Sequence, residues 1–547
     1  MSTRAPEPPM AAPDETSRQP DRPKRMRREA SRIGLLFVAL GAIIGSGWLL
    51  SPMYAAQIAG PAALLAWVLA GLAMVAIGLQ IAELSTMFPL AGGIARFPYF
   101  AFGGLAGYLV GWLAWLGFAT SAAIQVLTAL QYASNYIPWL THEEGGDITL
   151  TVGGYAVAVG LMLLFAAINI MGVRWLLRTT TIFGWWKVLV PVIMGLLIIA
   201  VGFHTHNLTG YGGFAPSGIK GILLAISTGG IIFAFNGFEQ AAVMAGESQN
   251  PRRNVPFAVI GSIAIASVIY VVLQLALLLG IGPAALRHGW AGVSISGTYG
   301  PFATIATALG LSWVAVLVYI SAFASPFGCG LVYVGSAART SYAVARNAEI
   351  GGPLTALSKK GVPVFDILLA AAVGMIALFP LPGWQVLVSF ITSAIVMMYA
   401  LMPLTCAALR RQLPNADRPY RVMGGDAFAF LGFVIANFVI YWAGWATNWK
   451  LLVAIGLGLV VLVFSLRTQR ARANLELRHA WWFLPYLVGL GILSYLSTFG
   501  GGSGVIPFGW DFPVVIAFSA VIWRLALASR LPVEGAEQNV HTTAWEA

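Results

Sequence analysis

The sequence predicts an all-α polytopic membrane protein, and three observations lead to this prediction. Hydrophobic residues make up 59% of the 547 residues and charged residues only 9%, whereas an average soluble domain is about 25% charged. Apolar stretches of about 20 residues, each long enough to cross a hydrocarbon layer of about 30 Å, recur along the chain. They lack the period-2 alternation of barrel strands, and a helix satisfies its own backbone in lipid. A soluble globular fold is excluded.

About fourteen apolar segments follow one another, counted at about 20 residues per crossing. The predicted spans are 34–58, 62–88, 104–134, 150–171, 181–203, 221–244, 256–281, 300–335, 364–380, 385–407, 427–446, 450–466, 481–498 and 512–528. A stretch rich in Pro, Arg and Glu precedes them at 1–32 and is typical of a disordered tail. We expect a ten-helix core at 33–410, four additional membrane helices at 411–530 and a second tail at 531–547.

The positive charges indicate the orientation of the chain. When the loops are assigned alternately to the two sides of the membrane, nearly all of the 31 Lys and Arg residues fall on the side of the N-terminus. The exceptions are Lys220, Arg287 and Lys450 on the other side and Lys187 within a span. Because Lys and Arg accumulate in cytoplasmic loops, both tails are predicted to be cytoplasmic, with the helices in a bacterial inner membrane. Topology explains the net charge of +11, so the lipid bilayer, and not nucleic acid, is the expected partner.

Three charged residues lie within predicted spans, namely Glu83, Lys187 and Glu239. Each costs about 2.5–3.5 kcal/mol on insertion scales and is therefore a functional hypothesis. Glu83 is near the cytoplasmic end of its span, where interfacial donors favour a structural role. Lys187 either snorkels to the interface or acts inside the bundle, and Glu239 has a structural hydrogen-bonding role or a functional one.

Two spans carry paired interruptions. The first span contains GAIIGSG at 41–47, and the sixth contains GGIIFAFNGFE at 229–239. Glycine costs about 1 kcal/mol in a helix interior, so these runs are natural sites of unwinding. The two runs stand five spans apart, and because five is odd the two halves would be inverted relative to one another, with repeats at about 33–205 and 218–410. In inverted-repeat transporters, corresponding broken helices mark the substrate site; the alternative is that the glycines only permit close helix packing.

The broken ends suggest a ligand. The half-helix that begins near Gly47 offers unpaired N–H groups and a partial positive charge, and the Ser46 hydroxyl adds a donor, which together suit a carboxylate. The half-helices that stop near Ile43 and Phe233 offer carbonyl oxygens, which suit an ammonium group. This combination describes an α-amino acid.

These motifs resemble the amino acid-polyamine-organocation (APC) superfamily of permeases. The resemblance rests on residues 41–48, on AELSTMFP at 82–89 with the following Gly92-Gly93, on 233–239 and on GESQNPRRNVP at 246–256. It implies the leucine-transporter (LeuT) fold, with ten core helices in two inverted five-helix repeats, and alternating access around broken spans 1 and 6.

The resemblance also implies roles for single residues. It implies that Ser46 and Gly47 bind the substrate carboxylate, that the carbonyls of Ile43 and Phe233 bind the amino group, and that the Phe233 ring is a gate. Asn236 and Gly237 complete the predicted substrate site.

Lys187 resembles a span 5 lysine that replaces a bound sodium ion between spans 1 and 8 in proton-coupled and some sodium-independent members. Burial disfavours an ammonium group, so gain or loss of its proton can bias helix positions. Lys187 and Glu239 are therefore the predicted proton-coupling residues. The alternative is that Lys187 is a fixed structural cation.

The four additional spans and the glycine-rich stretch around 489–511 are similar to bacterial permeases of the aspartate:proton symporter type. Predicted core spans contain no Arg and no second Lys, so an acidic side chain would be recognised by neutral donors or taken up protonated. The candidate donors are Gln125, Asn236, Ser389, Thr392 and Ser393. An apolar substrate is equally compatible with the sequence.

The predicted function is therefore secondary active import of an amino acid, by proton symport, with aspartate or glutamate as a candidate substrate. The alternative is sodium-independent exchange of amino acids or amines. An enzyme is not expected, because the six histidines all fall in predicted loops or tails and leave no catalytic set at depth. Cys329 and Cys406 lie in separate apolar runs, so we expect no disulfide framework, no metal site and no cofactor. The sequence indicates no oligomeric state.

Overall fold

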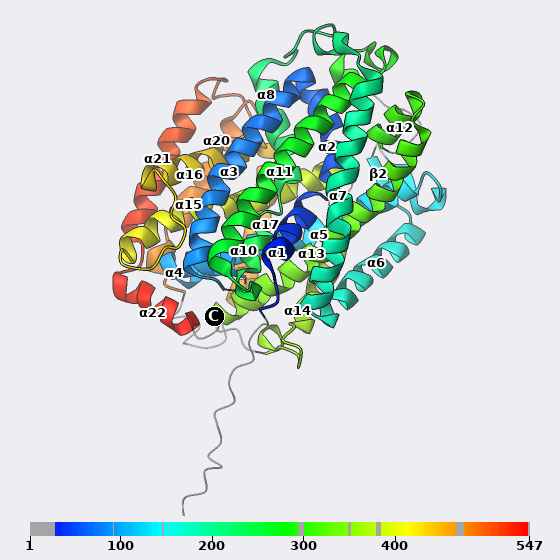
Figure 1. Cartoon of the computed structure of the whole chain (residues 1–547). Helices are drawn as coiled ribbons and strands as arrows, with labels where there is room; N and C mark the ends of the chain where they lie inside the picture. The colour runs from blue at the N-terminus through cyan, green and yellow to red at the C-terminus, as the bar shows by residue number, and fades with distance from the viewer. Residues whose placement is uncertain are drawn as a thin grey trace, which may run out of the picture.

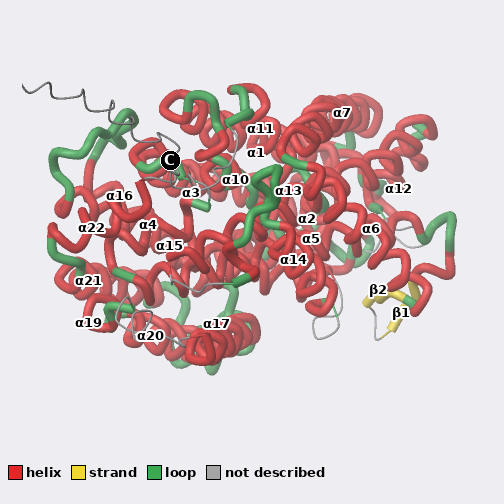
Figure 2. The backbone as a smooth tube through the Cα atoms, turned by 90° about the horizontal axis from the view of Figure 1, so that it is seen from below, coloured by secondary structure: helices red, strands yellow, loops and turns green. Residues whose placement is uncertain are grey.

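The computed structural model describes residues 28–90, 92–144, 147–293, 300–347, 352–378, 384–465 and 475–544. Helices dominate these residues, and the sheet they contain is a two-stranded hairpin (Figure 2). Ten described helical stretches are long and apolar enough to cross a membrane, which confirms the all-α polytopic class. Residues 1–27 of the predicted N-terminal tail and 545–547 of the predicted C-terminal tail lie outside the described residues.

The elements up to residue 150 surround the first predicted interruption. They are α1 (Arg32–Ile43), α2 (Gly47–Ala59), η1 (Gly60–Ala62), α3 (Ala63–Met87), α4 (Gly93–Phe102), α5 (Gly104–Ala133), η2 (Pro138–Leu140), β1 (Thr141–Glu144) and β2 (Asp147–Leu150). The hairpin β1–β2 is antiparallel, with Thr141 opposite Leu150. Sequence analysis predicted neither this hairpin nor the short buried helix α4.

The next elements contain the second interruption. They are α6 (Val152–Met171), α7 (Val173–Gly202), η3 (Thr205–Leu208), α8 (Gly218–Thr228), α9 (Ile231–Phe235), α10 (Gln240–Val243), η4 (Ala245–Glu247), α11 (Pro251–Gly280), η5 (Pro283–Leu286), η6 (Trp290–Gly292), α12 (Pro301–Ala308), α13 (Ser312–Asn347), η7 (Pro353–Thr355), α14 (Val364–Ala377) and α15 (Trp384–Gln412). Where 300–335 was predicted as one span, the chain forms α12, turns at Gly310 with φ of +76°, and then forms the longer α13. The prediction was wrong there because a glycine in the left-handed region ends a helix.

The remaining helices form a group on one flank of the bundle. They are α16 (Gly425–Trp442), α17 (Trp445–Ser465), α19 (Leu477–Ala480), α20 (Phe483–Leu496), α21 (Asp511–Ser529) and α22 (Val533–Ala544). Helix α16 packs against α3, α8 and α15, and α17 packs against α5 and α15 (Figure 1). Within the predicted tail 531–547, α22 is helical and lies against α4.

The short helices α1, α9 and α10 are enclosed by longer ones. Helix α1 packs against α7, α11 and α13 (Figure 1). Helix α9 packs against α2, α3, α8 and α15. These contacts place both predicted interruptions in the interior of the bundle.

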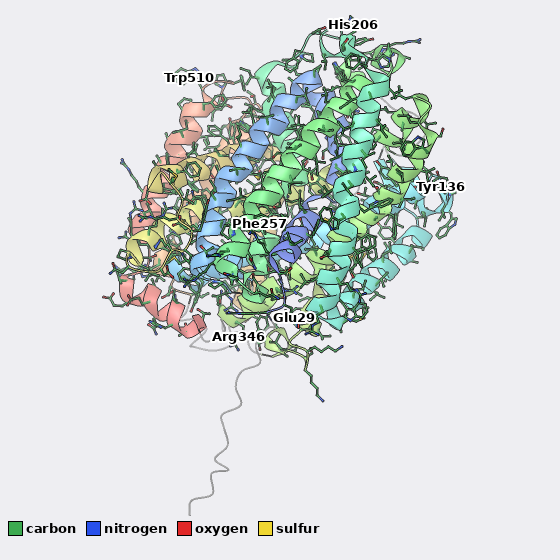
Figure 3. All side chains as sticks on the ribbon, in the orientation of Figure 1. Glu29, Tyr136, His206, Phe257, Arg346 and Trp510 are labelled. Atoms are coloured by element: carbon green, nitrogen blue, oxygen red, sulfur yellow. The ribbon has the colours of Figure 1, made fainter. Side chains whose placement is uncertain are left out.

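Loops that the sequence assigns to opposite sides of the membrane lie at opposite ends of the molecule. His206 and Trp510 are at one end, and Glu29 and Arg346 are at the other (Figure 3). At the latter end the chain before α1 is packed, because the buried Ala30 donates from its N–H to the Glu247 carbonyl at 2.9 Å.

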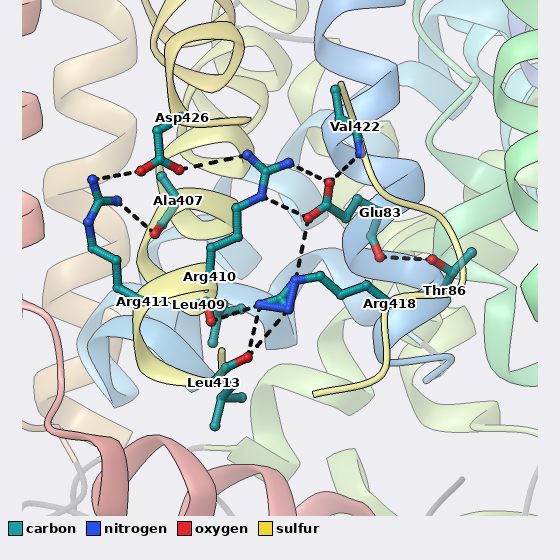
Figure 4. Close-up of polar contacts among 10 residues, drawn as sticks. All are labelled: Glu83, Thr86, Ala407, Leu409, Arg410, Arg411, Leu413, Arg418, Val422 and Asp426. Carbon is teal, nitrogen blue, oxygen red and sulfur yellow. Dashed lines mark hydrogen bonds and ion pairs between the residues drawn. The ribbon is translucent and has the colours of Figure 1, made fainter. Parts of the chain in front are cut away.

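Glu83 anchors a cluster of charges at the end of α3 (Figure 4). Its carboxylate accepts hydrogen bonds from Arg410 Nε at 2.9 Å, from a second Arg410 nitrogen at 2.5 Å and from the Val422 N–H at 2.8 Å. The Arg418 guanidinium lies 3.6 Å away. Glu83 thus reaches donors near the end of its span, as expected, and joins α3 to α15 and to the chain that leads into α16.

Glu83→Gln is expected to lower the thermal stability of the protein markedly. The Glu83 side chain is 1% exposed and that of Arg410 is 10% exposed, and removing one partner of a buried ion pair costs roughly 3–5 kcal/mol. Asp417→Asn is the control, because Asp417 and its partner Arg252 are 65% and 64% exposed and such pairs contribute about 0–1 kcal/mol. Thermal unfolding in detergent tests this; equal melting temperatures of the two variants would contradict it.

Several arginines that the sequence assigned to loops lie within core helices. Arg96 lies in α4, Arg339 in α13 and Arg410 in α15. Arg339 forms a buried ion pair with Glu247, as Arg410 does with Glu83. The predicted core spans themselves contain no arginine, because α13 and α15 extend beyond the apolar segments 300–335 and 385–407, and α4 lies between two predicted spans.

Candidate substrate site

The first interruption is a true break in the helix. Helix α1 ends at Ile43, α2 begins at Gly47, and the residues between them are not helical. The Ser46 N–H donates to Gln125 Oε1 on α5 at 2.7 Å. In the described part of the chain, the N–H groups of Gly47 and Trp48 have no acceptor. The buried N-terminus of α2 therefore presents two free amides.

The carbonyls at the end of α1 are, in contrast, all used. Lys187 Nζ donates to the Gly41 carbonyl at 2.7 Å and Cys329 Sγ to the Ala42 carbonyl at 2.9 Å. The Tyr270 hydroxyl donates to the Ile43 carbonyl at 3.0 Å. The Leu40 carbonyl accepts from the backbone at Ile44. These donors come from α7, α13 and α11 and satisfy carbonyls that a helix end leaves unpaired.

The second interruption consists of two breaks. Gly230, with φ of +82°, separates α8 from α9. After α9 the chain is extended at Asn236, with ψ of 138°, and turns at Gly237, with φ of +128°, before α10 begins at Gln240.

The two interruptions touch one another through glycines. A Cβ atom on Gly47 would lie 2.7 Å from Ala234 Cα, and one on Gly237 would lie 2.5 Å from the Ile43 backbone nitrogen. Both distances are too short for contacts between non-bonded atoms, so a larger residue would push the two spans apart. The structure therefore brings together the predicted residues of spans 1 and 6.

Phe233 contacts a pair of stacked aromatic rings. Its ring meets Trp384 of α15 edge to face at a centroid distance of 5.8 Å, and Trp384 stacks on Tyr54 of α2 at 5.3 Å. The Ser51 hydroxyl donates to the Gly230 carbonyl at 2.9 Å and further ties α2 to the break. The Phe233 carbonyl accepts from the Asn236 N–H at 3.1 Å.

Several buried polar atoms around the breaks have no hydrogen-bond partner within the described residues. They are Ser46 Oγ, both amide atoms of Asn236, and the hydroxyls of Ser121, Ser325, Thr392 and Ser393. Each such atom costs about 1–3 kcal/mol, and buried polar groups are normally paired. Along α15, Thr392 and Ser393 lie between Trp384 and Tyr399, which contact the second interruption on either side. A polar ligand at the breaks would relieve this cost.

Lys187 lies between α1 and α13 and is 1% exposed. Its Nζ contacts the Gly41 carbonyl, and a Cβ on Gly328 of α13 would lie 3.0 Å from that nitrogen. Among the described residues no carboxylate forms an ion pair with it. Snorkelling is excluded by this burial. The proton-coupling role remains a prediction.

Glu239 is fully buried beside the break and is surrounded by neutral donors. Its carboxylate accepts from the Gly237 N–H at 2.8 Å, from Gln240 Nε2 at 2.7 Å and from the Tyr399 hydroxyl at 2.6 Å. No cation pairs with it in the described part of the chain. An unpaired charge at such a buried position costs free energy, and binding of a proton to the carboxyl group removes that cost.

Sequence analysis did not identify Tyr270, Tyr399 or the contact between Cys329 and α1. Gln125 was considered only as a donor to substrate, but its Oε1 accepts from Ser46. No group of three or more His, Cys, Asp or Glu residues that could hold a metal is present within the described ranges.

Comparison with known proteins identifies the family. The family model described as amino acid permease matches residues 31–465. The glutamate/serine transporter AimA of Bacillus subtilis (strain 168) is 34% identical over 519 residues, which cover 93% of this chain and 95% of that protein. The aspartate-proton symporter of the same strain is 34% identical over 510 residues, covering 92% and 97%. The branched-chain amino acid permease BcaP is 26% identical over 451 residues, covering 80% and 93%. The chain therefore belongs to the amino acid permease family, and it is a multi-pass membrane transporter, not an enzyme.

Proposed function

We propose that this protein is a secondary active transporter that imports aspartate or glutamate together with a proton. The observation that carries the proposal is the meeting of the two interruptions, whose residues include the free amides of α2 and the unpaired polar atoms of Ser46 and Asn236. Two relatives that align over nearly the whole chain are named for glutamate, serine and aspartate, and one of them for proton symport.

The architecture we propose is the LeuT fold with fourteen crossings. Helices α1 and α2 form one broken crossing and α8 to α10 another, as the predicted spans 34–58 and 221–244 require. The distribution of Lys and Arg supports cytoplasmic termini and a location in the bacterial inner membrane.

The substrate would lie with its carboxylate at the N-terminus of α2. There the Gly47 N–H and the Ser46 hydroxyl are unpaired, and the helix dipole favours an anion. The amino group would bind the carbonyls of Ile43 and Phe233. The side-chain carboxyl group would reach the Asn236 amide, next to Gly237 at the break.

Proton coupling would act through Lys187 and Glu239. Lys187 bonds to the last turn of α1, and Glu239 bonds to the break between α9 and α10, so each buried group touches one broken span. A change of protonation alters these hydrogen bonds and thereby biases the spans toward one of two arrangements.

Currents from proteoliposomes on a solid-supported membrane test the proposal. Aspartate, glutamate, serine and leucine are applied in turn, with and without a pH gradient, and in the absence of sodium. We expect charge movement with aspartate or glutamate that depends on pH. Silence with every substrate, together with counterflow of labelled amino acid, would establish exchange instead.

A further inference from the structure

A single hydroxyl group joins the two interruptions. Tyr270 of α11 is fully buried. Its hydroxyl oxygen lies within hydrogen-bond distance of two carbonyl oxygens, that of Ile43 at the end of α1, at 3.0 Å, and that of Ala234 in α9, at 2.7 Å. The first of these carbonyls is the predicted acceptor for the amino group of the substrate.

The Tyr270 ring is held in place on two sides. Its centroid lies 4.8 Å from that of Trp67 and 5.3 Å from that of Phe235, which it meets edge to face. Trp67 Nε1 in turn donates to Gln274, one turn further along α11. The position of the hydroxyl is therefore set by packing, and small movements of α1 or α9 change which carbonyl it favours.

The two carbonyls depend on this hydroxyl to different degrees. The Ile43 carbonyl also accepts from the Gly45 N–H at 2.9 Å. In the described residues no backbone N–H reaches the Ala234 carbonyl, because α9 ends one residue later and the chain then extends. A phenol has one proton to donate. The Ala234 carbonyl has no other donor among the described residues and needs this proton, whereas the Ile43 carbonyl keeps the Gly45 N–H when the Tyr270 hydroxyl turns away from it.

We propose that Tyr270 is a positioning residue that fills the amino-group subsite at the Ile43 carbonyl while no substrate is bound. When the substrate binds, its ammonium group takes over this carbonyl, and the hydroxyl keeps its bond to Ala234. Substrate binding at span 1 thus changes the hydrogen bond that Tyr270 makes to span 6. This inference rests on the proposed function, since it requires an amino acid whose ammonium group binds Ile43.

Tyr270→Phe is expected to tighten substrate binding and to slow transport. The variant keeps the ring but removes the competitor, and a neutral hydrogen bond of about 0.5–1.5 kcal/mol corresponds to about two- to tenfold in Kd. The maximal rate should fall, because the two broken spans lose their link. A residue with a merely structural role would weaken binding or leave it unchanged.

Replacement of Tyr270 by 4-aminophenylalanine should act in the opposite direction. The amino group has two N–H bonds and can donate to Ile43 and Ala234 at once, so it would hold the subsite and raise the Kd. The ring keeps its size, so this replacement also tests the inference if Tyr270→Phe fails to fold.

The experiment measures binding of labelled aspartate and initial rates of uptake in proteoliposomes. Tyr486→Phe is the matched control, because Tyr486 of α20 is also fully buried and donates to Asn437 at 2.7 Å, away from the breaks. Opposite shifts in Kd for the two Tyr270 replacements, with none for the control, support the inference. Unchanged or parallel shifts overturn it. If the wild-type protein itself binds no amino acid, the proposed function fails first.

Discussion

Gly47→Val is expected to weaken substrate binding strongly and to stop transport, because the two interruptions meet at this glycine. A Cβ at this position would lie 2.7 Å from Ala234 Cα and 2.8 Å from its Cβ. Backbone on the facing side cannot rotate away as a flexible side chain can, so α2 and α9 must separate. Overpacking of this kind costs about 1–3 kcal/mol or more. Here it also displaces α2 and α9, which carry residues of the proposed substrate site. We expect the binding of labelled aspartate to weaken by at least about tenfold.

The matched control is Gly160→Val on α6. Apart from the adjacent residues and backbone of its own helix, no atom of the described residues lies within 4 Å of a Cβ built at Gly160, so this variant should bind and transport as the wild type does. Size-exclusion chromatography of both variants separates a loss of binding from a loss of folding. Normal affinity in a folded Gly47→Val protein would refute the contact between the two spans.

Lys187→Ala abolishes the pH dependence of uptake while some binding persists. The Nζ atom touches the Gly41 carbonyl, two residues before the predicted amino-group acceptor, so the change uncouples the charge from span 1 without removing Ile43 or Ser46. One coupled proton supports about tenfold accumulation per unit of pH difference. This accumulation should be lost, whereas counterflow of labelled substrate should continue.

Lys187→Met separates the loss of charge from the loss of volume, because it fills nearly the same space without a charge. It should behave as Lys187→Ala does. Lys220→Met is the control, since Lys220 lies on α8 and donates to the Thr498 carbonyl away from the breaks. Accumulation that still follows the pH gradient in both Lys187 variants would remove this residue from the coupling mechanism.

The breaks in spans 1 and 6 could be predicted because glycine has a strong local effect. The runs at 41–47 and 229–239 disfavour a continuous helix whatever surrounds them, and the structure unwinds at 44–46 and around 229–230 and 236–239. A charged residue within an apolar span also indicated the position of the site, since Lys187 and Glu239 are both buried beside a break.

The partners of these residues could not be predicted, because they depend on the rotation of neighbouring helices about their axes. Tyr270, Cys329 and Tyr399 are apolar or weakly polar residues within long apolar runs, and nothing local distinguishes the one that faces a broken helix. Arg339 and Glu247 were assigned to loops for a related reason. Where the long helix α13 continues past its apolar segment, Arg339 is buried in an ion pair with Glu247, and no local pattern shows this pairing.

The end of α1 has a consequence for how fast span 1 can move. Its last carbonyls are each tied to a different neighbouring helix, through Lys187, Cys329 and Tyr270. Breaking all three bonds at once would add about 3 kcal/mol to an energy barrier, at about 1 kcal/mol each, whereas exchanging them one at a time keeps every step small. Span 1 can then move in several small steps, and two of the three hydrogen bonds hold its end while the third is exchanged.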